Sequence, residues 1–366
     1  MHEQEKIFLI KGHPFDKDGL ISFCSGEISS PNTPGWEREI WEFIMDWFSP
    51  DEYLEVQTSG STGKPKQIQL LKEHIRESAR LTLDFFGLQP GDTALLCLPV
   101  KYIAGKMMVV RSLEGGLNLL LTKPSGIPDV RPFDKITFSA MVPMQVTELL
   151  AEYDGKIQLE KINKLIIGGS VIDKTLEKKL INSGNRIWQT YGMTETISHI
   201  ALRKVNGSDA TSWYSPLLGV DLKKDERACL VITAPHIGIQ DLITNDRVEF
   251  NEKGSFKVLG RTDNVVISGG VKLYPGEIEQ KLSGLVENDF IVTGLPDNKL
   301  GEKLVLFIEG EDTSKSGKED LWQDVKRRLS GYEVPKTIIF LKAFNRNSQG
   351  KIMRKMTVDN FLTNTL

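Results

Sequence analysis

Cysteine is scarce in this chain of 366 residues, which contains only Cys24, Cys97 and Cys229. Three scattered cysteines without C-x-x-C spacing exclude a disulfide framework and a cysteine metal site, and they favour a reducing cytoplasm. The histidines also lack metal-ligand spacing, so we interpret them as structural or surface residues. The five histidines are His2, His13, His74, His199 and His236.

The sequence also lacks long hydrophobic runs and a strong charge imbalance. No apolar run approaches the ~20 residues of a membrane-spanning helix, so we expect no membrane insertion. The segment from Met1 to Lys6 carries charges and no long apolar region, which argues against a signal peptide. With 46 basic and 49 acidic residues the net charge is −3, so we do not expect nucleic acid as a partner.

The chain does contain short apolar segments that alternate with helical patterns, over a length that suggests roughly two domains. Apolar periodicity and short apolar runs predict helices at 36–48 and 173–183, and strands at 93–99, 117–121, 165–167 and 186–191. Such alternation is typical of an α/β fold, here α+β overall. We therefore predict a large, layered N-terminal domain at residues 1–260.

The pattern changes in the last third of the chain. Residues 228–259 read as short strands with turns, which predicts a small β-rich element. After Gly260 we expect helices near 276–285 and 318–330, strands near 290–294, 304–309 and 336–341, and a surface loop at 310–318. This pattern predicts a small α+β C-terminal domain at residues 261–366.

Residues 58–66 form the most informative segment, Thr-Ser-Gly-Ser-Thr-Gly-Lys-Pro-Lys. Glycines let backbone N–H groups point into one concavity, hydroxyls add donors and lysines add positive charge, which suits a polyphosphate. The segment is not a Walker A loop, because Thr58 and Pro65 replace its Gly and its Ser or Thr. A flexible linker is the alternative, but it would not need two lysines and Pro65. The candidate ATP-binding residues are Thr58, Ser59, Gly60, Ser61, Thr62, Gly63 and Lys66.

A second candidate segment, Tyr-Gly-Met-Thr-Glu-Thr at 191–196, follows a predicted strand. Ligands of open α/β sheets bind beyond the carboxyl ends of strands. The ring of Tyr191 can stack on a purine, and the carboxylate of Glu195 can hold Mg²⁺ that bridges phosphates. The alternative is an ordinary turn with a solvent-facing glutamate.

Four further segments are weaker signals when each is taken alone. They are Gly168-Gly169-Ser170, Thr244-Asn245-Asp246, the run 260–270 continuing to Pro275-Gly276-Glu277-Ile278-Glu279, and Gly350-Lys351-Ile352-Met353-Arg354. Each has a structural alternative: a tight turn, a surface turn, a hairpin followed by a helix start, and a solvated loop.

Taken together, these segments resemble the adenylate-forming superfamily of acyl- and aryl-CoA synthetases, adenylation domains and luciferases. They are similar to its motifs [ST]-[ST]-G-[ST]-[ST]-G-x-P-K, Y-G-x-[ST]-E, T-G-D, G-R-x-D and N-x-x-G-K-[IV]-x-R, in the same order. The resemblance covers nearly the whole chain, although the part before Thr58 is short for this superfamily. Asn245 departs from the pattern, since it stands where the family has Gly.

The resemblance implies roles in nucleotide binding. Tyr191 would stack on adenine, Thr194 would contact the α-phosphate region, and Glu195 would carry Mg²⁺, with Gly192 as a further nucleotide-binding residue. Further expected nucleotide contacts are Gly168, Gly169 and Ser170 beside adenine and the acyl pocket, and Asp246 and Arg261 at the ribose.

The resemblance also implies a reaction in two steps. Lys351 would bridge the substrate carboxylate, the α-phosphate and the ribose while ATP is converted to an acyl-adenylate. Coenzyme A would then attack the adenylate. The C-terminal domain would be mobile, with Asp263 as its hinge, and Gly269-Gly270 would form a loop facing coenzyme A. Expected co-substrates and cofactor are therefore ATP, coenzyme A and Mg²⁺.

The acid is suggested by segment 98–116, which resembles compact bacterial o-succinylbenzoate–CoA ligases of menaquinone biosynthesis. Many relatives carry Phe-His in this segment, where this chain has Lys101-Tyr102, so a histidine gate cannot be assigned. The expected acid has a second carboxylate that needs a cation. Lys101, Lys106 and Arg111 are the candidates, with solvated surface residues as the alternative.

Three alternatives for function stay open on the sequence. The chain could be another aryl- or acyl-CoA ligase, an aryl-AMP ligase that loads a carrier protein, or a catalytically inactive nucleotide-binding protein. Glu195 and Lys351 together argue against the last of these. We expect a cytoplasmic enzyme acting on a small carboxylic acid, and the sequence carries no prediction of its oligomeric state.

Overall fold

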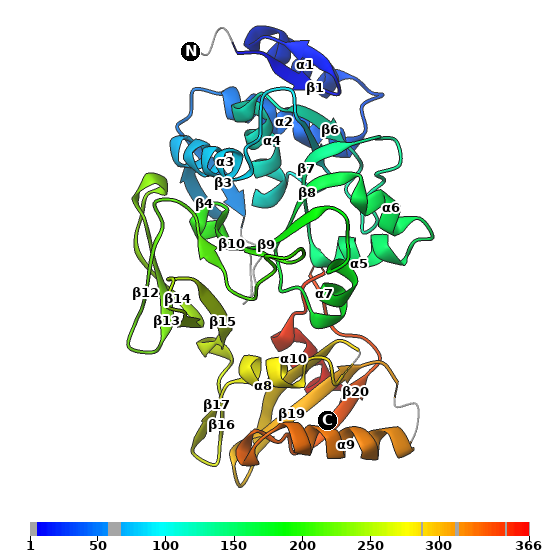
Figure 1. The fold of residues 1–366 in the computed structure, drawn as a ribbon, viewed down its shortest axis with the longest axis vertical. Coiled ribbons are helices and arrows are strands. Elements are labelled where there is room, and N and C mark those ends of the chain that lie inside the picture. The colour runs from blue at the N-terminus through cyan, green and yellow to red at the C-terminus, as the bar shows by residue number, and fades with distance from the viewer. Residues whose placement is uncertain (1–5, 58–66, 287, 312–314, 348–349, 366) are drawn as a thin grey trace. The chain divides into compact units, whose positions relative to one another are not determined.

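The structure is a computed structural model that describes residues 6–57, 67–286, 288–311, 315–347 and 350–365 (Figure 1). It divides into two compact units. The first comprises Met1–Ile172, Leu176–Asp221 and Ala234–Gln240, and the second comprises Asp173–Thr175, Leu222–Thr233 and Asp241–Leu366. The domain boundary predicted between residues 260 and 261 stays a prediction.

A nine-stranded sheet forms the framework of the first unit, in the order β11-β10-β9-β8-β7-β5-β6-β1-β2. The strands are β1 (Phe8–Ile10), β2 (His13–Phe15), β5 (Thr93–Leu96), β6 (Asn118–Leu121), β7 (Ile136–Met141), β8 (Ile162–Ile167), β9 (Arg186–Gly192), β10 (His199–Lys204) and β11 (Ser215–Pro216). The run from β9 to β1 is parallel, and β2, β10 and β11 pair antiparallel at the edges.

The predicted strands of this sheet are confirmed at β5, β6, β8 and β9. Parallel strands covered on both faces consist of near-continuous apolar residues, which explains why short hydrophobic runs identified them. Leu95, Phe138, Leu165 and Ile187, one from each of four neighbouring strands, are fully buried. The α/β class predicted for this part is therefore correct.

Helices of the first unit pack in pairs, α1 against α2 and α3 against α4, and α2 and α3 each have a distinct apolar face. They are α1 (Lys17–Ser29), α2 (Gly35–Phe48), α3 (Lys72–Phe86), α4 (Ile103–Gly115), α5 (Pro143–Ala151), α6 (Gly155–Glu160) and, begun in the second unit, α7 (Lys174–Leu180). The predicted helix at 36–48 is confirmed, because Ile40, Trp41, Ile44 and Trp47 lie on its buried face. None of the helices in the described ranges is long and apolar enough to span a membrane.

A two-stranded antiparallel sheet, β3 (Tyr53–Gln57) and β4 (Gln67–Leu71), flanks the predicted phosphate loop. Gln57 pairs with Gln67 at one end of this sheet. The loop prediction itself, residues 58–66, lies outside the described residues.

The second unit begins with most of a four-stranded sheet in the order β12-β13-β14-β15. Its strands are β12 (Asp221–Lys224), β13 (Cys229–Ala234), β14 (Ile239–Phe250) and β15 (Phe256–Arg261). These strands confirm the β-rich element predicted at 228–259.

The remainder of the second unit is a five-stranded sheet with helices on both faces. Strands follow the order β17-β16-β19-β18, with β20 beside β19. The elements are β16 (Val266–Ser268), β17 (Val271–Leu273), α8 (Pro275–Leu282), β18 (Phe290–Asp297), β19 (Gly301–Glu309), α9 (Lys315–Arg328), β20 (Thr337–Leu341) and α10 (Arg354–Thr365). The α+β prediction is correct, except that α9 begins inside the segment 310–318 that was predicted to be a loop.

Strand β19 shows how the two faces of this sheet are built. Leu304, Leu306 and Ile308 pack with residues of α8 and α9, whereas Val305 and Phe307 pack with residues of α10. Successive side chains of a strand point to opposite faces, so one continuous apolar run forms two small cores.

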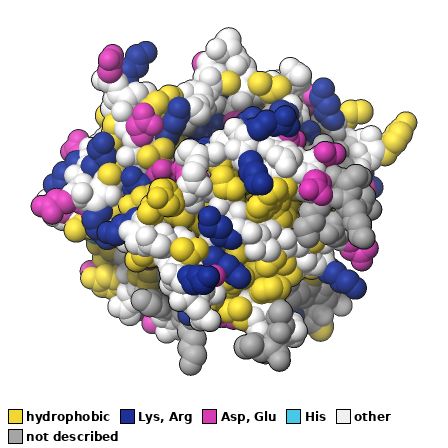
Figure 2. All heavy atoms as spheres, turned by 90° about the horizontal axis from the view of Figure 1, so that it is seen from below, with side chains coloured by type: hydrophobic (Ala, Val, Ile, Leu, Met, Phe, Trp, Pro, Cys, Tyr) yellow, Lys and Arg dark blue, Asp and Glu magenta, His cyan; other side chains and the backbone are white. Residues whose placement is uncertain are grey.

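The surface of the chain carries charges of both signs. On the face drawn in Figure 2, Lys and Arg side chains lie next to hydrophobic groups, and Asp and Glu lie mainly toward the rim. One charged side chain links two helices of the second unit, since Arg328 of α9 donates to the carbonyl of Lys281 in α8 at 3.0 Å.

Candidate active site

The Tyr-Gly-Met-Thr-Glu segment lies at the tight connection between β9 and β10. Strand β9 ends at Gly192, a 3₁₀ turn spans Thr194–Thr196, and β10 returns antiparallel from His199. Gly192 is required here, because a Cβ would lie 2.4 Å from the carbonyl oxygen of Ser198. The hydroxyl of Thr196 accepts from the Met193 N–H at 2.9 Å, which fixes the turn.

The side chains of this turn remain available to a ligand. Tyr191 is partly buried and meets Tyr214 edge to face, with ring centroids 6.0 Å apart. Thr194 is half-buried. Glu195 is exposed, and it pairs with no basic side chain among the described residues. These environments leave an aromatic face, a hydroxyl and a carboxylate on one short segment.

The Gly168-Gly169-Ser170 segment follows β8, the parallel neighbour of β9, so both segments leave the same edge of the sheet. Gly169 has φ of +85°, which favours glycine, and a Cβ on Gly168 would lie 2.4 Å from the hydroxyl of Thr190. Gln189 of β9 donates to the Ser170 carbonyl at 3.3 Å. The structure therefore brings 168–170 and 191–195 together.

A magnesium ion at this edge of the sheet would need ligands from a bound substrate in addition to those from the protein. The described residues contain no group of three or more His, Cys, Asp or Glu side chains that could hold a metal. Mg²⁺ usually keeps several waters and binds one or two carboxylates together with substrate phosphates, so the exposed Glu195 suits that manner of binding.

In the second unit, Arg261 joins two of the predicted motifs. Asp246 on β14 is opposite Arg261 on β15, and Nη1 of Arg261 donates to Oδ1 of Asp246 at 3.1 Å. Nε and Nη2 of Arg261 donate to Oδ1 and Oδ2 of Asp263 at 2.9 and 2.5 Å. Asn245, which stands where the family has Gly, is exposed, so its side chain does not crowd this pair.

Lys351 belongs to the same charged group. Although burial acts to raise the pKa of Asp263, hydrogen bonds from Arg261 and the charge of Lys351 lower it. The pKa of Lys351 is lowered, first by desolvation of its ammonium and then by Arg261, while Asp246 and Asp263 act to raise it. Lys351 is exposed as a whole residue, whereas its ammonium, whose pKa is lowered chiefly by burial, is the less exposed part of its side chain.

The turn that presents Lys351 explains the N-x-x-G-K spacing. The side-chain oxygen of Asn347 accepts from the Lys351 N–H at 2.9 Å, and Gly350 has φ of +77°. Only residues with a low cost at positive φ suit such a position. Residues 348–349, between them, lie outside the described residues.

The remaining motif residues of the second unit have structural roles that the sequence reasoning did not assign. Arg354 forms a two-pronged ion pair with Glu279 of α8, with N···O distances of 2.6 and 3.0 Å. Glu277 forms an ion pair with Arg247 of β14. Ion pairs from two motifs that lie far apart in sequence therefore connect α8 with α10 and with the four-stranded sheet. In the sequence, the only indications of these pairs were the spacings Glu-x-Glu at 277–279 and Lys-x-x-Arg at 351–354.

Gly269 and Gly270 form the two-residue turn between β16 and β17. Both have positive φ, +58° and +82°, and Ser268 pairs with Val271 across the turn. Positive φ at both central residues is typical of a type I′ hairpin, which requires glycine or a similar residue. The hairpin explains the glycine pair, and its role toward coenzyme A stays a prediction.

The three candidates for the second carboxylate differ in their surroundings. Lys101 is exposed and precedes α4. On α4, the Nζ of Lys106 lies 4.3 Å from the ring centroid of Phe43, and burial lowers its pKa although Asp46 acts to raise it. The structure therefore directs Lys106 toward α2.

Arg111 alone of the three contacts the motif hairpin. It is 1% exposed, and its Nη2 donates to the hydroxyl of Ser198 at 2.5 Å. Its Nε has no hydrogen-bond partner, and it forms no ion pair with any described residue. Burial lowers its pKa to about 9, which still leaves it charged at neutral pH. Within the part of the chain that the structure describes, Arg111 is thus a buried cation without a counter-ion.

Sequence reasoning did not single out the polar residues beside Arg111. His199 was grouped with structural or surface histidines, and Ser198 and Thr82 were not considered. His199 lies in hydrogen-bond range of both Ser198 and Thr82, at 3.3 Å from each. Their separation in sequence gave no spacing signal, since α3, α4 and β10 meet only in the folded chain.

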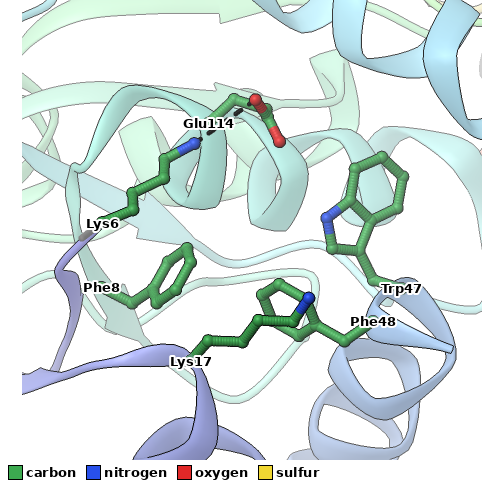
Figure 3. A pocket seen from close by; sticks show the side chains of 6 residues that line it. All are labelled: Lys6, Phe8, Lys17, Trp47, Phe48 and Glu114. Atoms are coloured by element: carbon green, nitrogen blue, oxygen red, sulfur yellow. Dashed lines mark hydrogen bonds and ion pairs between the residues drawn. The ribbon is translucent and has the colours of Figure 1, made fainter. Parts of the chain in front are cut away.

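A pocket elsewhere in the first unit contains none of the predicted site residues. Figure 3 shows its lining, with Lys6 forming an ion pair with Glu114 at 3.4 Å. The lining residues are Lys6, Phe8, Lys17, Trp47, Phe48 and Glu114. They come from β1, α1, α2, α4 and the segment before β1, so we interpret the pocket as a packing junction.

Comparison with known proteins agrees with the motifs. A 2-succinylbenzoate–CoA ligase of Bacillus cereus (strain Q1) is 27% identical over 97% of this chain and 79% of its own. A solved acyl-CoA synthetase (AMP-forming)/AMP-acid ligase II-like protein of Dyadobacter fermentans is 35% identical, with a TM-score of 0.62 over 93% of this chain and 97% of its own. The o-succinylbenzoate–CoA synthetase of Bacillus subtilis, solved with ATP and magnesium, shares the fold at 24% identity, with a TM-score of 0.68 over 83% of this chain and 69% of its own.

The family model described as AMP-binding enzyme matches residues 36–254, which is more than half of the chain. The match includes segments 58–66, 168–170, 191–196 and 244–246, on which the resemblance was based. The predicted resemblance is therefore confirmed, and the chain belongs to the family of AMP-binding enzymes.

Proposed function

We propose that this chain is an ATP-dependent acid–CoA ligase that forms an acyl-adenylate and then a thioester, and that its acid is o-succinylbenzoate. The family, and relatives named 2-succinylbenzoate–CoA ligase that cover 97% of the chain, support the reaction class. The cytoplasm, where coenzyme A and ATP are available, is the proposed compartment.

The choice of acid rests on the burial of Arg111 and on the absence of an ion-pair partner for it among the described residues. Burying a charge without a partner costs several kcal/mol, so such a charge is retained where a partner arrives. Arg111 touches Ser198, three residues beyond Glu195, and its Nε is unpartnered. An acid with two carboxylates would have one consumed in the reaction and the other paired with this guanidinium.

In the first step, an oxygen of the substrate carboxylate forms a bond to the α-phosphorus of ATP, and the bond to pyrophosphate breaks. Negative charge spreads over the phosphoryl oxygens, so the protein contributes positioning and charge stabilisation. Lys351 supplies an ammonium for the α-phosphate, and Asp246 and Arg261 supply groups for the ribose hydroxyls. Tyr191 supplies a face for adenine, and Thr194 a hydroxyl for the α-phosphate region.

Two parts of the nucleotide site involve groups or residues that the structure does not describe. Glu195 would hold Mg²⁺, which when bound neutralises charge on the phosphates. Thr58 to Lys66 would contact the polyphosphate.

In the second step, the thiol of coenzyme A loses its proton and its sulfur bonds to the acyl carbon, while the bond to AMP breaks. Lys351 serves the first step only. We therefore propose that the C-terminal domain, residues 261–366, rotates about Asp263 between the two steps. The two-residue turn Gly269-Gly270 would then approach coenzyme A.

The test is pyrophosphate release with a panel of acids, with and without coenzyme A. The panel holds o-succinylbenzoate and two matched mono-acids, 4-oxo-4-phenylbutanoate and 2-butanoylbenzoate, each of which lacks one of its carboxylates. We expect release with o-succinylbenzoate at a kcat/KM at least ~10²-fold above either mono-acid, and thioester formation when coenzyme A is present.

Other outcomes would identify the alternatives. An acyl-adenylate that coenzyme A does not consume would indicate a ligase that loads a carrier protein. Equal activity with the mono-acids would indicate another acyl- or aryl-CoA ligase. ATP binding without pyrophosphate release with any acid would indicate an inactive nucleotide-binding protein.

A further inference from the structure

Behind Arg111 lies a continuous chain of neutral polar side chains from three elements of the first unit. Nη2 of Arg111 on α4 is 2.5 Å from Oγ of Ser198, which is 3.3 Å from Nδ1 of His199 on β10. Nε2 of His199 is 3.3 Å from Oγ1 of Thr82 on α3, which is 3.2 Å from the carbonyl oxygen of Ser78. The chain therefore connects the unpaired guanidinium to the backbone of α3.

The donors and acceptors of this chain can be assigned from its two ends. An arginine only donates, so Ser198 Oγ accepts from Arg111 and has its own proton for His199. At the far end Thr82 gives its only proton to a carbonyl, so it must accept from Nε2 of His199. The Thr82 end therefore places a proton on Nε2, and at the other end a bare Nδ1 can accept the proton of the Ser198 hydroxyl.

The surroundings keep this imidazole neutral. His199 is 7% exposed, and burial followed by the positive charge of Arg111 lowers its pKa well below the ordinary value. A protonated ring would have a donor at Nδ1 and could no longer accept the proton of the Ser198 hydroxyl. The hydrogen-bond directions and the charge of Arg111 therefore favour the same state.

The backbone before Ser198 is strained in a way that places its hydroxyl. Ile197 has φ of +64° and ψ of −55°, and the Ser198 N–H donates to the Thr196 carbonyl at 2.6 Å. This is a γ-turn with positive central φ, which is rare, and unusual for a β-branched residue. Ile197 is 2% exposed, so packing holds the turn directly after the Thr194–Thr196 segment.

We propose that His199 is a positioning residue. As the Nε2–H tautomer it accepts the proton of the Ser198 hydroxyl at Nδ1, so that the Ser198 oxygen accepts from Arg111 and directs this guanidinium toward the second carboxylate of the substrate. This role rests on the proposed function. It assigns substrate specificity to a histidine that does not itself touch substrate. Arg111 has neutral partners on Nη1 (Met108 Sδ, 4.0 Å) and Nη2 (Ser198 Oγ), and its Nε has none.

The kinetic test compares His199→Leu, which removes both hydrogen bonds, with His199→Asn, whose amide oxygen can replace the acceptor at Nδ1. For His199→Leu we expect KM for o-succinylbenzoate to rise ~10–100-fold, and kcat/KM for the better mono-acid to fall much less. His199→Asn should recover most of the loss, and Thr82→Val, at the far end, should give an intermediate loss. Ser139→Ala, which removes a buried hydroxyl of β7 bonded to the carbonyl of Leu95, is the matched control for general damage.

A purely structural role would give a different pattern. If His199→Leu lowers kcat/KM equally for the di-acid and the mono-acid, or if His199→Asn is no better, the proposal is overturned while the proposed function stands. If the wild type itself ignores the second carboxylate, the choice of acid falls, and this role falls with it.

A measurement on the wild type covers the case in which His199→Leu does not fold. Nitrogen-15 chemical shifts of the histidine rings at pH 7.5 distinguish the two neutral tautomers and the imidazolium. We expect His199 to have a protonated Nε2 and a bare Nδ1. A ring protonated on Nδ1, or on both nitrogens, would contradict the assigned hydrogen-bond directions and overturn the proposal.

Discussion

Two arginines of this chain occupy opposite electrostatic settings. Arg111 in the first unit is fully buried, contacts only neutral groups and forms no ion pair with any described residue. Arg261 in the second unit is 42% exposed along its side chain and is held by both Asp246 and Asp263. The charge of Arg261 has the lower free-energy cost, since water and two carboxylates stabilise it.

The two arginines differ in whether nearby carboxylates already balance their charge. Around Arg261 the charges are already balanced, so a ribose would meet a preorganised set of donors and acceptors. Around Arg111 the balance is incomplete, and an incoming carboxylate would complete it. A buried cation that destabilises the free protein can therefore select an acid that brings its own negative charge.

The largest effect is expected from Lys351, which belongs to the charged cluster around Arg261. Lys351→Ala should reduce adenylation by ~10²–10⁴-fold, because it removes a charge that stabilises the transition state. Thioester formation from a supplied acyl-adenylate should continue. Lys355→Ala, a change at an exposed residue of α10, should behave as wild type. Equal loss of both half-reactions in Lys351→Ala would contradict its role.

The next effect concerns the unbalanced cation. Arg111→Met should raise KM for o-succinylbenzoate and reduce its preference over the matched mono-acids by ~10²-fold, with little change in KM for ATP. Lys101→Met and Lys106→Met should keep the preference, because Lys101 is exposed and Lys106 packs on Phe43. Measured kcat/KM values that place the loss on either lysine would reverse this assignment.

A third change breaks a paired arginine. Arg354→Met leaves Glu279 without its two-pronged partner in a partly buried position, which should lower the free energy of unfolding by about 2 kcal/mol. Arg131→Met, which breaks an exposed pair with Asp129, should leave chemical denaturation unchanged. Similar denaturation curves for both variants would show that the Glu279 pair has no special structural role.

The proposed hinge gives a fourth test. Proline fixes φ near −65°, so Asp263→Pro should favour one orientation of the C-terminal domain. We expect adenylation to persist and thioester formation to fall by about tenfold or more. Asp263→Asn, which keeps the backbone free, should retain both steps better. Wild-type rates for both half-reactions in Asp263→Pro would contradict rotation about this residue.

The smallest effect concerns pH. The pKa of His199 is lowered on folding, so the unfolded chain binds the proton more readily. Stability from this residue is therefore complete above its ordinary pKa and decreases as the pH falls through it, by about 1 kcal/mol between pH 7 and pH 5.5. Denaturation curves of His199→Asn should lack this contribution, whereas the exposed His13→Asn should retain it. Parallel pH profiles for wild type and His199→Asn would contradict the burial effect.

Much of the fold could be predicted from the sequence because the signals were local. The apolar stripe of α2 and the buried runs of β5 and β8 depend on spacing within one element. The end of the predicted loop at 310–318 was wrong because α9 begins at Lys315, in a polar stretch with little apolar periodicity. Helix boundaries are decided by capping and packing that composition does not reveal.

The candidate site was predictable only where its residues share a segment. Tyr191 to Glu195 and Asn347 to Lys351 could be found as motifs, because turns require fixed spacings. The relation between Glu279 and Arg354, and between Arg111 and His199, could not be found, because each pair lies on elements that meet only after folding. The three candidate cations looked equivalent until burial and partners separated them.

The most direct test of this account is a crystal structure of the protein with a non-hydrolysable o-succinylbenzoyl-adenylate analogue. We predict that the free carboxylate lies within ~2.7–3.0 Å of the guanidinium of Arg111, with the Ser198 contact retained. A free carboxylate that contacts Lys101, Lys106 or only solvent, with Arg111 still unpaired, would contradict the claim that the buried arginine selects the acid.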